Sequence, residues 1–384
     1  MIDRTRRLAA PWVALVLALG ACGGADSGET TTTTVSDATT TSVDAGAGSL
    51  DDCPNPLVIQ TDWFPEPEHG ALYQLTGGQG SIDPETGAFR GPLTDDPDLT
   101  IEIRAGGPYI GFQPQTTMMY SDDSIFLAYI NTDSQIASFP DFPSIAVVAP
   151  LEKNPQLLMF DPETYDFETF SDIGESGAVV SVFAGVYYPD YLVGTGQLTA
   201  DQIDPSYTGS QARFIAEDGA LVQQGFVTQE PWNYENVFAE WGRPVDWLLI
   251  HDSGYEIYSQ VLAIRADKLD ETASSCLTAF VPLVQQAVVD FMADPGPVND
   301  AILRAVEDLE SFWELDPAGV ENTVQVMDEL DIVGNGPNDT VGDFDLDRVE
   351  ALIDQLRVIP AFEVGDVEAT DIVTNEFIDP SIGF

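Results

Sequence analysis

Short apolar runs rich in β-branched and aromatic residues alternate with segments of helical length over the first two thirds of the chain. The runs begin with PLVIQTDWF and end with VDWLLIHD, and between them lie LTIEIRAG, SIFLAYIN, SIAVVAPL, AVVSVFAG and LVQQGFVT. Strands separated by segments long enough for a crossover helix are typical of α/β units. The pattern therefore predicts an α/β fold with largely parallel sheets.

The pattern becomes helical beyond Asp270. In CLTAFVPLVQQAVVDFMAD the large apolar side chains recur on one helical stripe, and VNDAILRAVEDLESFW and LDRVEALIDQLRVI repeat that period. Such stripes are the core faces of amphipathic helices. About 330 residues follow the N-terminal segment, and a single hydrophobic core usually organises fewer than that. We therefore expect two α/β lobes and a helical C-terminal part.

The N-terminus has the pattern of an export signal. Three arginines within the first seven residues precede the apolar run LAAPWVALVLALGA, which is too short for a stable membrane span. The run ends in LALGAC, which resembles the bacterial lipobox and implies cleavage before Cys22 and a diacylglyceryl anchor on its sulfur. The alternative is an ordinary signal peptide beside an incidental cysteine. We expect a lipoprotein signal peptide over residues 1–21 and a disordered Thr/Ser/Gly/Asp-rich tether over residues 22–52.

The charge of the chain is strongly negative. It has 13 Lys and Arg against 65 Asp and Glu, a net charge of −52 at pH 7. A field of this sign repels polyanions, so we expect no nucleic-acid partner and no attachment to anionic lipid through a basic patch. Surface carboxylates that maintain solubility in a saline environment explain this acidic protein most simply.

The three cysteines divide between two roles. With Cys22 lipidated, Cys53 and Cys276 remain in an oxidising extracytoplasmic compartment. We expect them to pair and to tie the start of the domain to a late helix. Two buried thiols are the alternative, because spacing does not fix spatial proximity.

Three segments resemble one family of proteins, in order along the chain. They are DWFPEPEHGALY, LVQQGFVTQEPWNYENV and the C-terminal TNEFIDPSIGF. They are similar to segments of the thiamine-pyrimidine-precursor binding and synthesis family, which belongs with the nitrate, sulfonate and taurine substrate-binding proteins of ABC importers. The glycine-broken LTGGQGSIDPETGAFRGPL and the second-lobe entry FETFSDIGESGAVVSVFAGVYY depart from the family pattern.

The resemblance implies a type II periplasmic-binding-protein fold, in which two α/β lobes joined by two crossing strands clamp a ligand. The crossings are expected near SIAVVAPLEKNP and GYEIYSQVLAIR. The first lobe would comprise residues 55–147 plus 258–384, and the second lobe residues 148–257. Ligands of open α/β sheets bind at the carboxyl ends of strands.

Two clusters of candidate ligand-binding residues follow predicted strands and point to one cleft. Trp63 and Phe64 follow the first strand, and Gln229 and Glu230 follow LVQQGFVT. Trp63 is the candidate stacking platform for a flat ring, with packing between the lobes as the alternative. Glu230 would accept hydrogen bonds from a ring amino group, or else cap a helix.

Weaker candidates lie on both sides of these clusters. His69 and Tyr73 are four residues apart on a helix and would face the cleft together, although a lone histidine is more often structural. Tyr187 and Tyr188 follow a strand, and Tyr255 lies near the second crossing, where aromatic residues are often structural. The helix after Gly185 would offer backbone N–H groups to a polar ligand.

These features together predict a membrane-tethered extracytoplasmic substrate-binding protein of an ABC importer that clamps a small heteroaromatic ligand of the thiamine-pyrimidine-precursor type. We expect an importer permease and ATPase as partners, a monomer, no cofactor and no metal site. DTVGDFDLDRVE fits no register of a calcium loop, and two separated histidines do not suggest zinc.

Three alternatives stay open. The first is a binder of a small anion such as sulfonate or nitrate. The second is an enzyme like the pyrimidine-precursor synthases, although TDWFPEPEHG lacks the lysine that a Schiff base needs, and so we expect no enzymatic activity. The third is a sensory lipoprotein that keeps the fold without a transporter.

Overall fold

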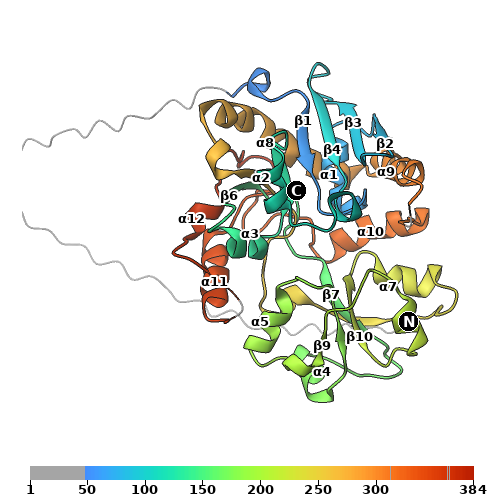
Figure 1. Cartoon of the computed structure of the whole chain (residues 1–384). Coiled ribbons are helices and arrows are strands. Elements are labelled where there is room, and N and C mark those ends of the chain that lie inside the picture. The colour runs from blue at the N-terminus through green and yellow to red at the C-terminus, as the bar shows by residue number, and fades with distance from the viewer. Residues whose placement is uncertain (1–47, 312, 361, 363) are drawn as a thin grey trace, which may run out of the picture. The chain divides into compact units, whose positions relative to one another are not determined.

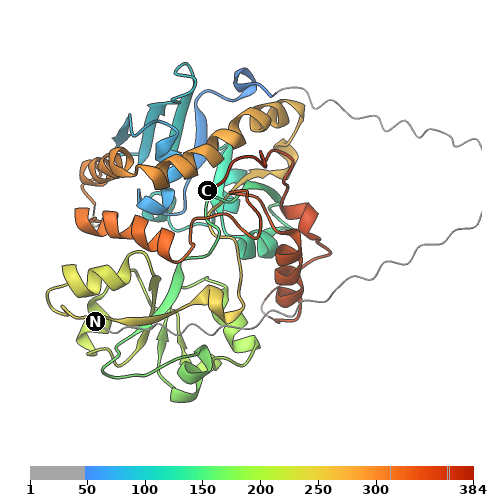
Figure 2. The same ribbon diagram turned by 180° about the vertical axis from the view of Figure 1, so that it is seen from behind.

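The computed structural model of the chain describes residues 48–384 except residues 312, 361 and 363. The chain from Gly46 to Phe384 forms one compact unit. The expected signal peptide, the lipidated Cys22 and the tether up to residue 47 lie outside the described residues. Figures 1 and 2 show the compact unit from two opposite sides.

Two sheets organise the fold. The first has seven strands in the order β2 (Ser81–Asp83), β3 (Ala88–Pro92), β4 (Thr100–Arg104), β1 (Leu57–Gln60), β5 (Leu127–Ile130), β12 (Val261–Arg265) and β6 (Ser144–Val148). The second has five strands in the order β11 (Asp246–Leu249), β7 (Gln156–Phe160), β10 (Val222–Phe226), β8 (Val180–Ser181) and β9 (Ile203–Asp204). We call the part built on the first sheet the first lobe and the part built on the second sheet the second lobe.

Both sheets are mixed, so the expectation of largely parallel sheets is wrong. In the first sheet β1 pairs parallel with β4 and β5, but β2, β3 and β12 pair antiparallel with their neighbours. In the second sheet β7 pairs antiparallel with both β10 and β11. The segment LTGGQGSIDPETGAFRGPL, glycine-broken in the sequence, forms the β2–β3 hairpin, and a two-strand hairpin is necessarily antiparallel.

Most helices are short. They are α1 (Gly70–Gln74), α2 (Gln115–Ser121), α3 (Thr132–Ser138), α4 (Phe170–Ser176), α5 (Tyr188–Gly194), α6 (Ala212–Ala216), α7 (Glu230–Trp232), α8 (Glu271–Ala293), α9 (Gly296–Asp308), α10 (Pro317–Glu329), α11 (Leu346–Arg357) and α12 (Ala369–Ile372). The four longest, α8 to α11, follow Asp270, as the sequence predicts. Asp270 itself begins this helical part, because its carboxylate accepts hydrogen bonds from the backbone N–H groups of Thr272 and Ala273.

Helices cover both faces of the first sheet. Along β1, Leu57 and Ile59 pack in the same apolar cluster as Phe280 of α8, whereas Val58 packs in the cluster that contains Ile136 of α3. Side chains alternate between the faces of a strand, so α8 and α3 lie on opposite faces. Figure 2 shows α8 running across the near face of this sheet.

The helix α8 belongs to the core. By length and composition it is the one helix among the described residues that is able to cross a membrane, with a mean hydropathy of 1.5 over its most apolar window. Half of that window is buried within the fold, where Leu277, Phe280, Val281 and Val284 are fully buried. Its apolar character is therefore explained by packing against the first sheet.

The chain passes between the two sheets twice. It leaves the first sheet after β6 and enters the second at β7, and it returns between β11 and β12. Both passages coincide with the crossings expected from the sequence. Two connections of this kind join two lobes on one side and leave a cleft between them.

A disulfide fixes the start of the described chain to the first lobe. Cys53 and Cys276, the pair expected from the sequence, are bonded, and Cys276 lies on α8. The backbone N–H of Ser49 also donates to the carbonyl of Ser275, and Leu50–Asp52 forms a 3₁₀ turn. The end of the segment expected to be a tether is thus folded onto α8.

Candidate ligand-binding site

A cavity of about 340 Å³ lies between the two lobes. The first lobe contributes Asp62, Trp63, Glu66, Gly107, Phe112, Asn131 and Trp313, and the second contributes Phe183, Gly185, Tyr207, Gln224, Gly225, Gln229 and Glu230, among others. This volume is in the range of small-molecule sites in proteins.

Trp63 is an aromatic wall of the first lobe. It lies three residues after β1, and its ring makes edge contacts with Phe64 and Trp313 at 5.6 and 5.8 Å between ring centroids. Gly107 has a φ of +56°, and a Cβ at that position would stand 3.0 Å from the Cε3 atom of Trp63. The glycine therefore lets the backbone approach the indole closely, and the ring is held in one position for stacking.

Aromatic side chains from other segments face Trp63. Phe183 of the second lobe lies 6.3 Å from Trp63 between ring centroids and 4.7 Å from Tyr207. Phe112 of the first lobe lies 6.1 Å from Trp63, is 64% exposed and has a φ of 56°. An exposed aromatic residue in the left-handed region costs folding free energy, and such outliers gather at ligand sites.

Charge in the cavity has one sign. Asp62, Glu66 and Glu230 are the charged residues among the described lining, and no Lys or Arg accompanies them there. Burial raises the pKa of Glu66 well above its usual range, and the neighbouring carboxylates of Glu68 and Asp62 raise it further. A buried carboxylate without a positive partner is costly, so this cavity favours a hydrogen-bond donor or a cation.

Glu230 lies where β10 meets α7. Its Oε2 atom accepts a hydrogen bond of 2.6 Å from the backbone N–H of Phe226. A Cβ at Gly225 would stand 2.6 Å from the Cγ of Glu230, so only glycine leaves room for this carboxylate. Burial raises the pKa of Glu230 to about 7, although the bond from Phe226 opposes the shift.

His69 is buried beneath Asp62 and Glu66 of the cavity lining. Its side chain is fully buried, and its Nε2 atom lies 2.9 Å from Asp62 Oδ1 and 3.3 Å from Glu66 Oε1. The amide nitrogen of Gln260, on the second crossing, lies 3.1 Å from Asp62 Oδ2 and 3.4 Å from His69 Nε2. The first lobe and one crossing therefore meet at a small polar cluster.

Hydrogen bonds also join the lobes directly. The hydroxyl of Thr228, after β10, donates to Glu68 Oε1, and the hydroxyl of Thr323 on α10 donates to the carbonyl of Thr228 at 2.9 Å. The indole N–H of Trp232 donates to Asp316 Oδ2 at 3.0 Å. These bonds connect the end of β10 and α7 to the first lobe across the cleft.

The structure brings Trp63, Gln229 and Glu230 of the candidate residues together in the cavity lining. Phe64 does not line the cavity; it is buried behind Trp63 with its ring stacked 5.9 Å from that of Trp313. The side-chain amide of Gln229 also donates to Thr323 at 3.3 Å.

Two further candidates on the first helix do not share the cavity as the sequence predicts. His69 lies below Asp62 and Glu66 and does not itself line the cavity. Tyr73 is buried in the core, with its ring 4.9 Å from Phe89. A spacing of four residues on one continuous helix would place both side chains on one side. His69 instead ends a 3₁₀ turn, whereas Tyr73 belongs to α1 and is buried in the core.

The remaining tyrosines have structural partners. Tyr187 lies 5.2 Å from the ring of Phe362, and the buried hydroxyl of Tyr255 donates to Asp133 at 2.8 Å. Tyr188 does not line the cavity, but its hydroxyl donates to Gln224 Oε1, and Gln224 does line it. Tyr188 therefore orients a lining residue.

Several lining residues escaped the sequence analysis. Phe112, Phe183, Tyr207 and Trp313 lie in connecting segments, where no periodicity marks the direction of a side chain. A signal was present for Phe183, because it lies near the end of the apolar run AVVSVFAG, shortly after β8, as Trp63 lies near the end of PLVIQTDWF, shortly after β1.

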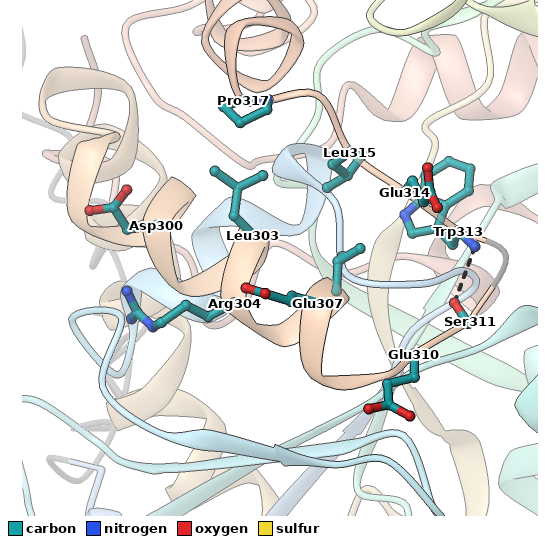
Figure 3. A pocket seen from close by; sticks show the side chains of 11 residues that line it. Asp300, Leu303, Arg304, Glu307, Glu310, Ser311, Trp313, Glu314, Leu315 and Pro317 are labelled. Atoms are coloured by element: carbon teal, nitrogen blue, oxygen red, sulfur yellow. Dashed lines mark hydrogen bonds between the residues drawn. The ribbon is translucent and has the colours of Figure 1, made fainter.

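A second hollow, of about 590 Å³, lies along α9 and the loop that leads to α10 (Figure 3). Arg304, Glu307 and Glu310 line it and are exposed. Trp313 lines both this groove and the cavity between the lobes. Charged side chains that are exposed to solvent are hydrated and need no bound ligand as a partner. We therefore place the binding site between the lobes.

No protein-family model matches the sequence, and no curated protein sequence matches it. Solved structures do match the fold. The alkanesulfonate-binding protein SsuA from Xanthomonas axonopodis pv. citri, bound to MOPS, is 14% identical with a TM-score of 0.53, over 84% of this chain and 99% of that one. The periplasmic aliphatic sulphonate binding protein SsuA from Escherichia coli is 13% identical with a TM-score of 0.53, over 80% and 86%.

A conserved Candida albicans gene product described as having the generic periplasmic binding protein fold is also similar. It is 13% identical with a TM-score of 0.50, over 85% of this chain and 98% of that one. Identities this low show the fold alone. Two mixed α/β lobes, two crossings and a cavity between the lobes agree with these neighbours, and the chain has the type II periplasmic-binding-protein fold.

Proposed function

We propose that this protein is a membrane-tethered, extracytoplasmic substrate-binding protein of an ABC importer. Its ligand is a small heteroaromatic molecule with a ring amino group, of the thiamine-pyrimidine-precursor type, clamped between the two lobes. Two structural neighbours are named as sulfonate-binding proteins, which supports the binding role but not this ligand.

The observation that carries the proposal is the pairing of Trp63 and Glu230 across one cavity. Trp63 belongs to the first lobe and offers a fixed aromatic face. Glu230 belongs to the second lobe and offers a carboxylate, which accepts hydrogen bonds from an amino group in the plane of a stacked ring. A ligand that satisfies both contacts bridges the lobes, and bridging favours the closed arrangement.

The charge of the lining argues against a sulfonate or nitrate ligand. The acidic side chains of Asp62, Glu66 and Glu230 line the cavity, and the described lining contains no guanidinium or ammonium group to hold an anion. The backbone N–H groups near Gly185 are the donors that an anion would use instead. The names of the neighbours suggest this second candidate function. Displacement of the bound ligand by a simple alkanesulfonate would favour it.

Enzymatic conversion of the ligand is the less favoured role. The described lining contains no lysine for a Schiff base, and Lys153 pairs with Asp331 outside the cavity. We therefore infer binding without covalent chemistry.

The lipid anchor rests on the sequence around Cys22. If Cys22 carries the lipid, Cys22→Ala should leave the protein unprocessed or in soluble form, whereas Cys53→Ala should not release it from the membrane. Partitioning into a detergent phase measures this directly. Unchanged partitioning of Cys22→Ala contradicts the anchor.

Native mass spectrometry of the freshly purified protein tests the ligand class. We expect a co-purifying molecule of low mass whose fragments contain an aminated aromatic ring. An alkanesulfonate, or an aliphatic ligand without a ring, would contradict the proposal.

A further inference from the structure

Three side chains at the floor of the cleft have the geometry of a metal site. The ligand atoms of Asp62, Glu66 and His69 all lie within 4.8 Å of one another. His69 Nε2 is 2.9 Å from Asp62 Oδ1 and 3.3 Å from Glu66 Oε1. Ligand atoms bound at about 2.0–2.2 Å from one ion stand about 3 Å apart, so small shifts would suffice to place all three around it.

Acidic side chains outnumber basic ones around this cluster. Glu68 is buried beside it in the sequence, and Glu230 lines the same cavity as Asp62 and Glu66. His69 is the one basic side chain that pairs with these carboxylates among the residues that the structure describes. Buried carboxylates usually pair with a cation or coordinate a metal.

Gln260 gives a second and independent observation. It is 1% exposed, its amide nitrogen points at Asp62 and His69, and its Oε1 atom has no hydrogen-bond partner in the described structure. A half-turn of the amide would exchange the two atoms and direct Oε1 at the cluster. The backbone N–H of Gln260 donates to Asn131 Oδ1 at 3.0 Å, so this exchange leaves the main chain in place.

We propose that Asp62, Glu66 and His69, with Oε1 of Gln260 as a fourth ligand, bind one divalent first-row transition-metal ion at the floor of the cleft. One imidazole nitrogen with carboxylate and amide oxygens suits zinc and its neighbours in the first row better than calcium or magnesium, which prefer oxygen alone. Asp62 and Glu66 line the cavity, so further coordination positions on the ion face the ligand.

The ion changes what the cleft is able to hold. It neutralises the buried carboxylates beneath Trp63, and it offers a Lewis acid to a ring nitrogen or hydroxyl of a bound molecule. Metal ligands bind in their deprotonated forms, so binding of an ion is coupled to release of protons. The site is defined by the metal alone and does not depend on the proposed organic ligand.

Zinc titration of the metal-free compact unit tests the site, with protein that carries no polyhistidine tag. We expect one zinc ion per chain by calorimetry. Glu66→Gln and His69→Gln should each weaken binding by more than about 100-fold, because loss of a direct ligand exceeds the 10- to 100-fold effect of losing a supporting residue. His251→Gln is the matched control, since the chain has two histidines and His251 is remote from the cluster.

A spectroscopic measurement keeps the test independent of folding in the variants. Pulsed electron paramagnetic resonance of the wild type with one equivalent of Cu²⁺ should show coupling to one imidazole nitrogen, which His251→Gln retains. Absence of that coupling, or its loss in His251→Gln alone, overturns the proposal. So do equal affinities for zinc and calcium, or zinc binding that survives Glu66→Gln in a folded protein.

The two proposals fail separately. Zinc binding with no aromatic ligand contradicts the proposed function and leaves the metal site standing. A co-purified aromatic ligand in a protein that does not bind zinc overturns the metal site alone.

Discussion

At the scale of single residues, Trp63 is fixed in place from several sides. Gly107 lies against one ring edge, and Phe64 and Trp313 contact others. A ring held in this way loses little conformational entropy when a ligand stacks on it. Lost side-chain entropy therefore offsets little of the free energy that the stacking contact contributes to binding.

Trp63→Ala should weaken binding of the identified ligand by about 2 kcal/mol or more, the size of an interface hot spot. Calorimetric titration measures the loss. Tyr165→Ala is a suitable control, because Tyr165 also stacks on an aromatic partner, Phe167, but lies outside the cavity lining. If Trp63→Ala is folded and binds the ligand as tightly as the wild type, the indole only packs against its neighbours in the protein.

Ionisation of Glu230 should favour ligand binding and lower the free energy of unfolding. Its folded pKa of about 7 exceeds the ordinary value of 4.5, so the folded protein holds a proton that the unfolded chain releases between these pH values. The free energy of unfolding therefore falls as pH rises from about 4.5 to 7. Above pH 7 this loss of folding stability is complete.

Glu230→Gln should raise the free energy of unfolding at pH 8 by on the order of 1–3 kcal/mol and change it little near pH 5. The same change should weaken ligand binding at pH 8 by on the order of 1–3 kcal/mol, as for a hydrogen bond to a charged group. Denaturant unfolding and calorimetry at the two pH values measure both effects.

Asp133→Asn provides the comparison for Glu230→Gln. Burial also raises the pKa of Asp133, to about 6, but Asp133 does not line the cavity. We expect this variant to change stability without changing affinity. Stability of Glu230→Gln that follows the wild type at every pH would contradict the assigned shift.

The sequence identified the residues that follow strands and overlooked those in loops. Trp63 and Glu230 were predictable because the carboxyl ends of strands converge on one edge of the fold. Phe112 and Trp313 reach the cavity through a left-handed backbone and an interhelical loop, and neither leaves a periodic mark in the sequence. Glu66 was visible only as part of a proline-rich turn, since burial of its carboxylate depends on the opposite lobe.

At the scale of elements, helical periodicity was the stronger predictor. The apolar stripes after Asp270 correspond to α8, α9 and α11. Strand direction was not predictable, because helices cover both faces of the first sheet, and a strand buried on both faces has a continuous apolar run in either direction. The β2–β3 hairpin and the returning β12 decided the mixed topology.

The contact between α7 and the segment before α10 gives an element-scale prediction. Trp232→Phe removes the indole N–H that donates to Asp316 and keeps an aromatic ring in place. Loss of one such bond costs about 1 kcal/mol or more, which should shift the ligand-free protein toward an open arrangement.

Small-angle scattering should then show a larger radius of gyration for ligand-free Trp232→Phe, which ligand restores. Trp247→Phe, on β11, is the control for a tryptophan outside this contact. Identical scattering curves of Trp232→Phe and the wild type would show that the bond does not influence closure.

At the scale of the whole molecule, the disulfide connects the start of the first lobe to α8, the first long helix after the second lobe in the sequence. It joins residues 223 positions apart, and everything in the second lobe lies within that loop. A cross-link over a long loop restricts the unfolded chain strongly.

Cys53→Ser should lower the free energy of unfolding by about 2–5 kcal/mol, and ligand affinity should stay within a few-fold because the cleft is remote from α8's N-terminal turns. Thermal unfolding and calorimetry measure the two quantities. Alkylation under denaturing conditions should label no thiol in the wild-type compact unit, and a labelled cysteine there would contradict the pairing.

The same bond determines how a mechanical load passes through the protein. A pull applied to the chain before Leu50 reaches Cys53 and is transferred at once to α8, within the first lobe. The crossings and the bonds across the cleft lie off that path. Tension on the N-terminal segment is thus borne by the first lobe, and the contacts that join it to the second lobe carry none of that load.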